Sequence, residues 1–148
     1  NKTTKVLDVG CGSGNLYFKL DGFFDKVYGL DISTKMAIEK GISPDFLYEA
    51  DCENMPFDDG TFDAIKGDYE TLIATNFLHS FDESTVKSWV ESAISRNNVK
   101  FLIFDEIHEN SEGYEYKHRF DEIVPGIKLI KKKEFILEKR DIVLFEVT

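Results

Sequence analysis

Three glycines at alternate positions, Gly10, Gly12 and Gly14, directly follow an apolar run at residues 6–9. An apolar run of this length predicts one buried strand, and the glycines predict a tight turn after it. Glycine adopts backbone conformations that other residues avoid, and without β-carbons the main chain lets a ligand approach closely. The turn is therefore a candidate binding loop, with an ordinary surface turn as the alternative that glycines alone leave open.

A carboxylate at the end of the next predicted strand strengthens the binding interpretation. The short apolar run 26–30 ends in Asp31, about twenty residues after Gly10, the separation at which an acidic residue in this kind of fold reaches a ribose hydroxyl. A glycine turn and an acidic residue at this separation together favour a nucleoside-containing ligand.

Residues 6–14, 28–33 and 49–65 resemble, in order and spacing, successive motifs of the class I S-adenosylmethionine-dependent methyltransferases. The resemblance covers roughly the first half of the chain. The second half fits that family only in its pattern of predicted strands and helices. The resemblance implies S-adenosyl-L-methionine as the cofactor.

By this resemblance, Asp51 would accept a hydrogen bond from the adenine amino group, and the backbone N–H of Cys52 would lie on the ring. Asp51 could instead be a solvent-facing acid in a turn. Asp8 would orient the glycine loop or face the amino group of the cofactor. Gly67, Asp68 and Tyr69 would contact the methionine end of the cofactor or the substrate, unless they belong to an ordinary connecting loop. The predicted cofactor-binding residues are Asp8, Gly10, Cys11, Gly12, Gly14, Asp31, Ile32, Asp51, Cys52, Gly67 and Tyr69.

Candidate general bases follow the most apolar run of the second half, residues 99–104, which predicts a fifth strand. Asp105, Glu106 and His108 would then face the same crevice as Asp31, and a methyl acceptor with an O–H or N–H group must lose a proton. A solvated acidic loop is the alternative. His118, in a tyrosine-rich stretch at residues 111–120, is a further candidate, although such a stretch could simply pack over the sheet.

The elements that must position these residues alternate as in a parallel sheet with crossover helices. A mostly parallel, seven-stranded Rossmann-like sheet of order 3-2-1-4-5-7-6, in a three-layer sandwich with one antiparallel C-terminal strand, is the fold that the resemblance implies. The remaining expected elements are helices at 15–20, 34–40 and 84–96 and strands at 46–50, 62–65, 127–137 and 142–148. Only residues 1–5 precede the first strand, whereas the family usually carries covering helices there, so these are missing or minimal.

Composition limits the class of protein. A chain of 148 residues suits a single domain, here a cofactor-binding methyltransferase domain over residues 1–148. With a net charge of −10, we expect no nucleic-acid partner, because phosphates would on the whole be repelled, although a local basic patch could override this repulsion. No apolar segment approaches the ~20 residues of a membrane helix and no signal peptide is visible, so no membrane partner is expected.

Cysteine usage points to the cytoplasm. Cys11 and Cys52 lie in different predicted loops with a strand between them, so we expect reduced thiols and no disulfide. Two cysteines and three scattered histidines have no metal-ligand spacing, so no metal site is expected.

The sequence thus predicts methyl transfer from S-adenosylmethionine to an O–H or N–H group of a small molecule. The alternative is a cofactor-binding or non-catalytic subunit whose pocket is covered by a second copy or another protein. A nicotinamide-dependent oxidoreductase fits less well, because its third glycine would follow the second by three residues.

Overall fold

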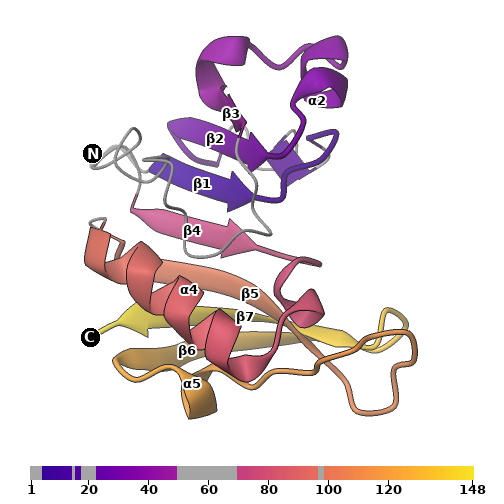
Figure 1. Ribbon diagram of the computed structural model, residues 1–148, viewed down its shortest axis with the longest axis vertical. Helices are drawn as coiled ribbons and strands as arrows, with labels where there is room; N and C mark the ends of the chain where they lie inside the picture. The colour runs from indigo at the N-terminus through magenta and orange to yellow at the C-terminus, as the bar shows by residue number, and fades with distance from the viewer. Residues whose placement is uncertain (1–4, 15, 18–22, 50–69, 97–98) are drawn as a thin grey trace.

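The computed structural model of the chain describes residues 5–14, 16–17, 23–49, 70–96 and 99–148. Its centre is a seven-stranded sheet in the order β3-β2-β1-β4-β5-β7-β6, which confirms the expected Rossmann-like topology (Figure 1). Strand β7 runs antiparallel to both β5 and β6, and the other pairings are parallel. The strands are β1 (Lys5–Val9), β2 (Lys26–Asp31), β3 (Leu47–Glu49), β4 (Thr71–Ala74), β5 (Phe101–Ile107), β6 (Ile127–Phe135) and β7 (Arg140–Val147).

The larger hydrophobic core lies on the face of the sheet that carries α4 (Glu83–Arg96) and α5 (Phe120–Ile123). Val86, Trp89 and Val90 recur at helical spacing on α4, so one stripe of the helix is fully buried against the strands. On the other face a smaller cluster is formed by Val6, Val27 and Ile73. Since β1 and β4 bury side chains on both faces, they read as continuous apolar runs.

Alternation along β5 sends its acidic residues to opposite faces of the sheet. Glu106 shares the face of Leu102 and Phe104, which belong to the larger core. Asp105 lies on the other face, with Ile103 packed against the smaller cluster. Two adjacent carboxylates therefore face different surroundings.

The fourth strand is not where the sequence placed it. The expected strand at residues 62–65 lies outside the described residues, and the position between β1 and β5 is occupied by β4, whose four residues are all buried. Periodicity does not identify a four-residue apolar run, and the turn-forming residues just before it suggested a loop. With the fourth strand at Thr71–Ala74, Leu78 and His79 of the next turn follow it after a short connection.

The fifth strand is longer than expected and runs to Ile107. Pairing with β7 continues through Asp105, Glu106 and Ile107, opposite Ile142, Asp141 and Arg140. Asp105 and Glu106 therefore lie inside the sheet instead of in a loop after it. The predicted C-terminal hairpin is confirmed.

The remaining helices are short. Helix α2 (Lys35–Glu39) follows Thr34 and is stopped at Gly41, whose φ is +102°. Turns of 3-10 helix occupy η1 (Pro44–Phe46) and η2 (Leu78–Ser80). Of the helix expected at residues 15–20, only Leu16 and Tyr17 are described. Within the described ranges, no helix has the length and apolar character needed to cross a bilayer.

Candidate active site

The glycine loop after β1 is held against the end of β2. The N–H groups of Gly10 and Cys11 donate to the carbonyl of Leu30 at 2.8 and 3.1 Å. Gly10, Gly12 and Gly14 have φ values of +73°, +53° and +83°, a region that residues with a β-carbon rarely occupy. The backbone geometry therefore requires glycines at these positions.

The surroundings of the glycines differ. A β-carbon on Gly14 would collide with Cδ1 of Ile42, so this glycine is required for packing. A β-carbon on Gly12 would meet no atom of the described residues within 4 Å. The main chain at Gly12 thus faces open space, as a loop that admits a ligand to the backbone must.

Asp31, the last residue of β2, accepts hydrogen bonds from main-chain groups beside this open space. Its Oδ2 accepts the N–H of Gly12 at 2.9 Å, and its Oδ1 accepts the N–H of Ser33 at 3.2 Å. Each carboxylate oxygen has two acceptor sites, so one remains on each oxygen for a ligand hydroxyl. The residues present therefore fit a ribose beside Gly12.

Further acidic groups surround the loop. Burial raises the pKa of the Asp8 carboxyl to about 7, and the negative charge of Asp31 adds to the rise. Burial, followed by the charges of Asp8 and Asp31, raises the pKa of the Cys11 thiol to about 12. On β3, Glu49 accepts hydrogen bonds from the N–H and hydroxyl of Thr34, which lower its pKa. This environment favours a cationic ligand and disfavours a phosphate.

The segment that leaves β4 packs on the glycine loop. The ring of Phe77 lies 3.4 Å from the position of a β-carbon on Gly10. Its neighbour Asn76 has a left-handed backbone, with φ of +55°, and donates its N–H to Oδ2 of Asp105 at 3.0 Å. The conformation of Asn76 is thus fixed by a buried carboxylate of the next strand.

Asp105 also holds Arg140, the first residue of β7. Nη1 of Arg140 donates to Oδ2 of Asp105 at 2.7 Å, and Nη2 donates to the hydroxyl of Tyr114 at 2.6 Å. The Tyr114 ring packs edge-on against His79, with centroids 4.6 Å apart, and Nε2 of His79 lies 3.2 Å from Oδ1 of Asn76. We call Asn76, His79, Asp105, Tyr114 and Arg140 the polar cluster.

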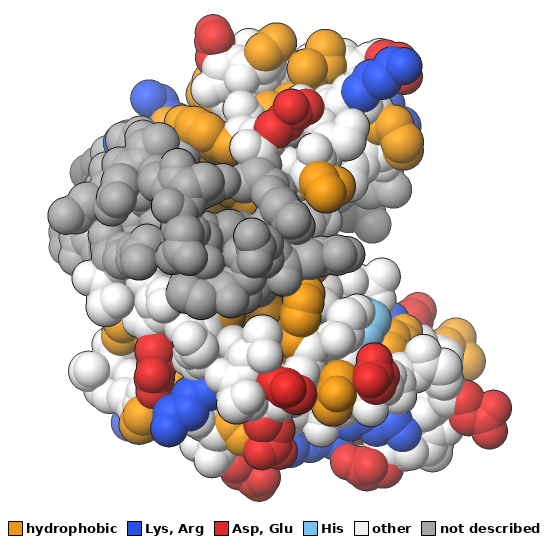
Figure 2. Space-filling view, in the orientation of Figure 1, with side chains coloured by type: hydrophobic (Ala, Val, Ile, Leu, Met, Phe, Trp, Pro, Cys, Tyr) orange, Lys and Arg blue, Asp and Glu red, His pale blue; other side chains and the backbone are white. Residues whose placement is uncertain are grey.

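The polar cluster and the glycine loop lie at the edge of the sheet where the parallel strands end, the edge at which ligands bind in α/β sheets. In Figure 1 the arrows of β1 and β4 point toward this edge, on the right, and Figure 2 shows the surface hollowed there. Phe77, which lies between Asn76 and His79 in the chain, packs against Gly10. The glycine loop and Asp31 can hold a nucleoside at Gly12.

A family model described as a methyltransferase domain matches residues 7–86, more than half of the chain. The chain belongs to the S-adenosylmethionine-dependent methyltransferase family. The predicted cofactor is therefore that of the family, and the glycine loop with Asp31 is the part of the described structure that fits it.

The relatives differ in what they act on. The sterol 4-C-methyltransferase strm-1 of Caenorhabditis elegans is 26% identical over 128 residues, which is 81% of this chain and 36% of that protein. The chain thus spans about a third of the length of this curated relative.

Solved structures share the fold. The magnesium protoporphyrin IX methyltransferase ChlM of Synechocystis PCC 6803, with bound S-adenosylmethionine, has a TM-score of 0.70 at 20% identity, over 97% of this chain and 69% of that one. An S-adenosylmethionine-dependent methyltransferase of Clostridium acetobutylicum has a TM-score of 0.64 at 13% identity, over 99% and 85% of the two chains.

The predicted cofactor residues are only partly described. Asp8, Gly10, Cys11, Gly12, Gly14 and Asp31 lie together around the glycine loop. The side chain of Ile32 is exposed beside them. Asp51, Cys52, Gly67 and Tyr69 lie outside the described residues, and their roles stay predictions.

The four predicted catalytic residues do not form one group: Asp105 lies apart, whereas Glu106 and His108 are linked through Lys132, whose Nζ lies 3.5 Å from Glu106 and 3.8 Å from Asp141. Only Asp105 belongs to the polar cluster. Glu106, on the opposite face, accepts the N–H of Phe120 at 3.1 Å and lies 3.5 Å from Nζ of Lys132; burial raises its pKa. His108 pairs with Asp141 at 2.8 Å.

Buried His118 lies 2.7 Å from the carbonyl oxygen of Phe81 through Nε2. Because a carbonyl oxygen only accepts, Nε2 donates this hydrogen bond. The hydrogen bond links His118, in the loop after β5, to Phe81, which directly follows η2. The general-base roles of Asp105, Glu106, His108 and His118 stay predictions.

Sequence reasoning did not single out Asn76, His79 or Arg140, and it considered Tyr114 only as one of the tyrosines of residues 111–120 that could form a substrate wall. The available signal for His79 was its place close after a buried strand, which the expected strand at residues 62–65 obscured. Arg140 carried no local signal, because it reaches Asp105 only through the antiparallel pairing of β7.

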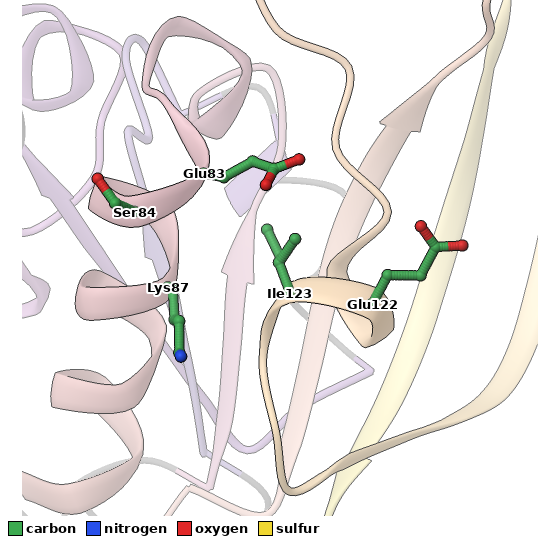
Figure 3. A pocket seen from close by; sticks show the side chains of 5 residues that line it. All are labelled: Glu83, Ser84, Lys87, Glu122 and Ile123. Carbon is green, nitrogen blue, oxygen red and sulfur yellow. The ribbon is translucent and has the colours of Figure 1, made fainter.

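A separate cavity of about 350 Å³ lies between α4 and α5 and is lined by Glu83, Ser84, Lys87, Glu122 and Ile123 (Figure 3). Glu83 points toward Ile123 across the gap, whereas Glu122 points away from α4. None of these residues belongs to the glycine loop or the polar cluster, so this cavity is not part of the candidate active site.

Proposed function

We propose that the protein transfers a methyl group from S-adenosylmethionine to an O–H or N–H group of a small molecule bound at the polar cluster. The cofactor, when bound, supplies a methyl group on a positively charged sulfur. The glycine loop and Asp31 hold it, and the acidic surroundings of Asp8 and Asp31 complement its positive charge. Methyl transfer of this kind depends mainly on alignment of the two reactants and exclusion of water.

The observation that carries the O–H or N–H assignment is the hydrogen-bonding state of His79. Its Nε2 faces Oδ1 of Asn76, which can only accept, so Nε2 bears the proton. In the neutral ring Nδ1 is then an acceptor, and it has no hydrogen bond in the part of the chain that the structure describes. His79 is therefore arranged to remove a proton from an acceptor group.

Tyr114 provides a matching donor. A guanidinium only donates, so the Tyr114 oxygen accepts from Arg140, and its own proton has no partner among the described residues. The hydroxyl can donate to an oxygen or nitrogen of the acceptor molecule. A hydrogen-bond donor on Tyr114 and a proton acceptor on His79, on two rings that pack edge to face, would fix the methyl-accepting molecule in one orientation.

The test compares His79→Gln with Ser80→Ala, an exposed neighbour, by release of S-adenosylhomocysteine with a panel of phenols, catechols, amines and sterols. We expect His79→Gln to lower kcat by about 10²–10⁴ on an O–H or N–H acceptor. Cofactor affinity, measured by calorimetry, should stay unchanged, because His79 does not contact the glycine loop. An unchanged kcat for His79→Gln would refute its role, and a larger loss in His108→Gln would restore the sequence-based assignment.

The second candidate function is a cofactor-binding subunit completed by a second copy or a protein partner. The hollow at the strand ends favours it, because no described residue covers the main chain at Gly12 and methyl transfer needs exclusion of water (Figure 2). Calorimetry would then show cofactor binding while no compound of the panel is methylated.

A further inference from the structure

We infer that the turn of the β6–β7 hairpin inserts into the surface of an anionic phospholipid membrane, with lysines of β6 on the headgroups. Ile136 and Leu137, adjacent in this turn, are 73% and 92% exposed. The larger exposed apolar side chains of a chain this size are usually scattered singly. Here two aliphatic side chains share one projecting tip.

Hydrogen bonds hold this turn in one position, so Ile136 and Leu137 are exposed on an ordered part of the chain. The N–H of Lys139 donates to the carbonyl of Ile136 at 3.2 Å, and the Lys139 carbonyl accepts the N–H of His108 at 2.9 Å. Nζ of Lys139 reaches the carbonyl of Asn110 at 3.4 Å. Ile136 and Leu137 are therefore presented by a turn tied to the loop after β5.

Lysines are concentrated in the hairpin that carries this tip, in a chain whose net charge is −10. Residues 127–140 contain six Lys or Arg and two Glu. Lys128, Lys131 and Lys133 are exposed and form no ion pair within the described residues. Lysines beside an exposed apolar element are the composition that binds anionic lipid surfaces.

The pattern favours a membrane over other anionic partners. A nucleic acid would use the lysines but would leave the two aliphatic side chains in water. Repulsion by the acidic remainder of the chain would orient the protein so that only the hairpin approaches the lipid. No membrane partner was expected from the sequence, because it has no apolar segment long enough to span a bilayer. A peripheral contact, however, needs no such segment.

The hairpin tip lies at the same edge of the sheet as the candidate active site. Strand β7 is antiparallel to both β5 and β6, so β6 ends at the edge where β5 ends. Figure 1 shows this turn on the right, the side to which β1 and β4 point. A membrane-bound molecule would thus turn its active-site edge toward the lipid, although the proposed contact does not depend on the proposed reaction.

The test is co-sedimentation of the purified protein with vesicles of phosphatidylcholine alone and of phosphatidylcholine with phosphatidylserine. We expect binding only to the vesicles that contain phosphatidylserine. The double variant Ile136→Ser with Leu137→Ser should lose binding by about tenfold or more, and Lys131→Gln with Lys133→Gln should lose about fivefold for each lysine. Met36→Ser on α2, a residue that is 58% exposed, is the control and should bind like the unmodified protein.

Insertion has its own readout. Leu137→Trp should shift its fluorescence to shorter wavelength with the phosphatidylserine vesicles. Equal vesicle binding of the double serine variant and the unmodified protein would overturn the inference. So would dependence on the lysines alone without a fluorescence shift, or concentration-dependent dimerisation without vesicle binding.

Discussion

At the scale of single residues, the candidate site combines buried acids with backbone donors. Asp31 is stabilised by two N–H groups, whereas the pKa of Asp8 is raised to about 7 by its burial. Burial therefore makes Asp8 carry charge less readily than an exposed carboxyl does. A cationic cofactor nearby would favour its charged form.

The raised pKa of Asp8 predicts a pH-dependent stability. Between the ordinary pKa of 3.8 and about 7, the folded protein keeps the proton that the unfolded chain loses. The stabilisation present at low pH is therefore lost as pH rises toward 7, by up to about 1.4 kcal/mol per pH unit. Between pH 5.5 and 7.5 we expect a fall in the free energy of unfolding of about 2 kcal/mol from this residue, measured by urea denaturation.

Glu106, whose pKa is also raised by burial, contributes with the same sign, so the comparison is made with Asp8→Asn. In this variant the free energy of unfolding should fall less between pH 5.5 and 7.5, by the amount that Asp8 contributes. An identical pH dependence in both proteins would mean that Asp8 is ionised in the folded state throughout this range.

At the scale of elements, β4 determines where the polar cluster stands. Its four buried residues place Asn76 and His79 directly after the strand end. Because β4 pairs with β1 on one side and β5 on the other, the connection after it lies between the glycine loop and Asp105. Because the fourth strand was expected at residues 62–65, Asn76 and His79 were not expected at its end.

The assignment of β4 is tested by a matched pair of truncations. Leu72 is fully buried in β4, and Leu137 is almost fully exposed in the hairpin turn. Leu72→Ala should lower the free energy of unfolding by about 2–5 kcal/mol, because it leaves a cavity in the core. Leu137→Ala should change it by less than about 0.5 kcal/mol. Denaturant unfolding measures both, and similar losses for the two variants would contradict this packing of the strand.

At the scale of the whole molecule, the ligand edge is assembled from both halves of the chain. The first half provides the glycine loop and Asp31, and the second half provides Asp105, Tyr114 and Arg140. The family model extends only to residue 86, so it covers the cofactor side and stops before most of the polar cluster. The proposed acceptor site therefore lies mostly outside the stretch that the family model matches.

Binding of the correct cofactor should stabilise the folded protein. S-adenosylmethionine at a hundred times its Kd should stabilise the folded protein by about 2.7 kcal/mol, which raises Tm by roughly 5–10 °C for a chain of this size. NAD at the same concentration should leave Tm unchanged. Asp31→Ala should weaken cofactor affinity by about 1–3 kcal/mol and reduce the shift, with exposed Asp45→Ala as the control. Equal shifts with NAD and S-adenosylmethionine would contradict the assignment of the cofactor site.

The sequence by itself determined the strand, glycine loop and acidic residue on which the cofactor site rests. These features are local: a left-handed backbone needs glycine, and a strand buried on both faces is a continuous apolar run. The strand order also followed from the family pattern, and the structure confirms it.

Only the tertiary structure decided which side chains meet beside that loop. Arg140 is 35 residues from Asp105 and 26 from Tyr114, and it reaches them because β7 returns antiparallel along β5. Adjacent Asp105 and Glu106 are separated by the alternation of one strand, and Ile136 and Leu137 are exposed because the turn projects beyond the core. Such contacts depend on strand register and on burial. Both are set by how strands pair, so a local stretch of sequence does not predict them.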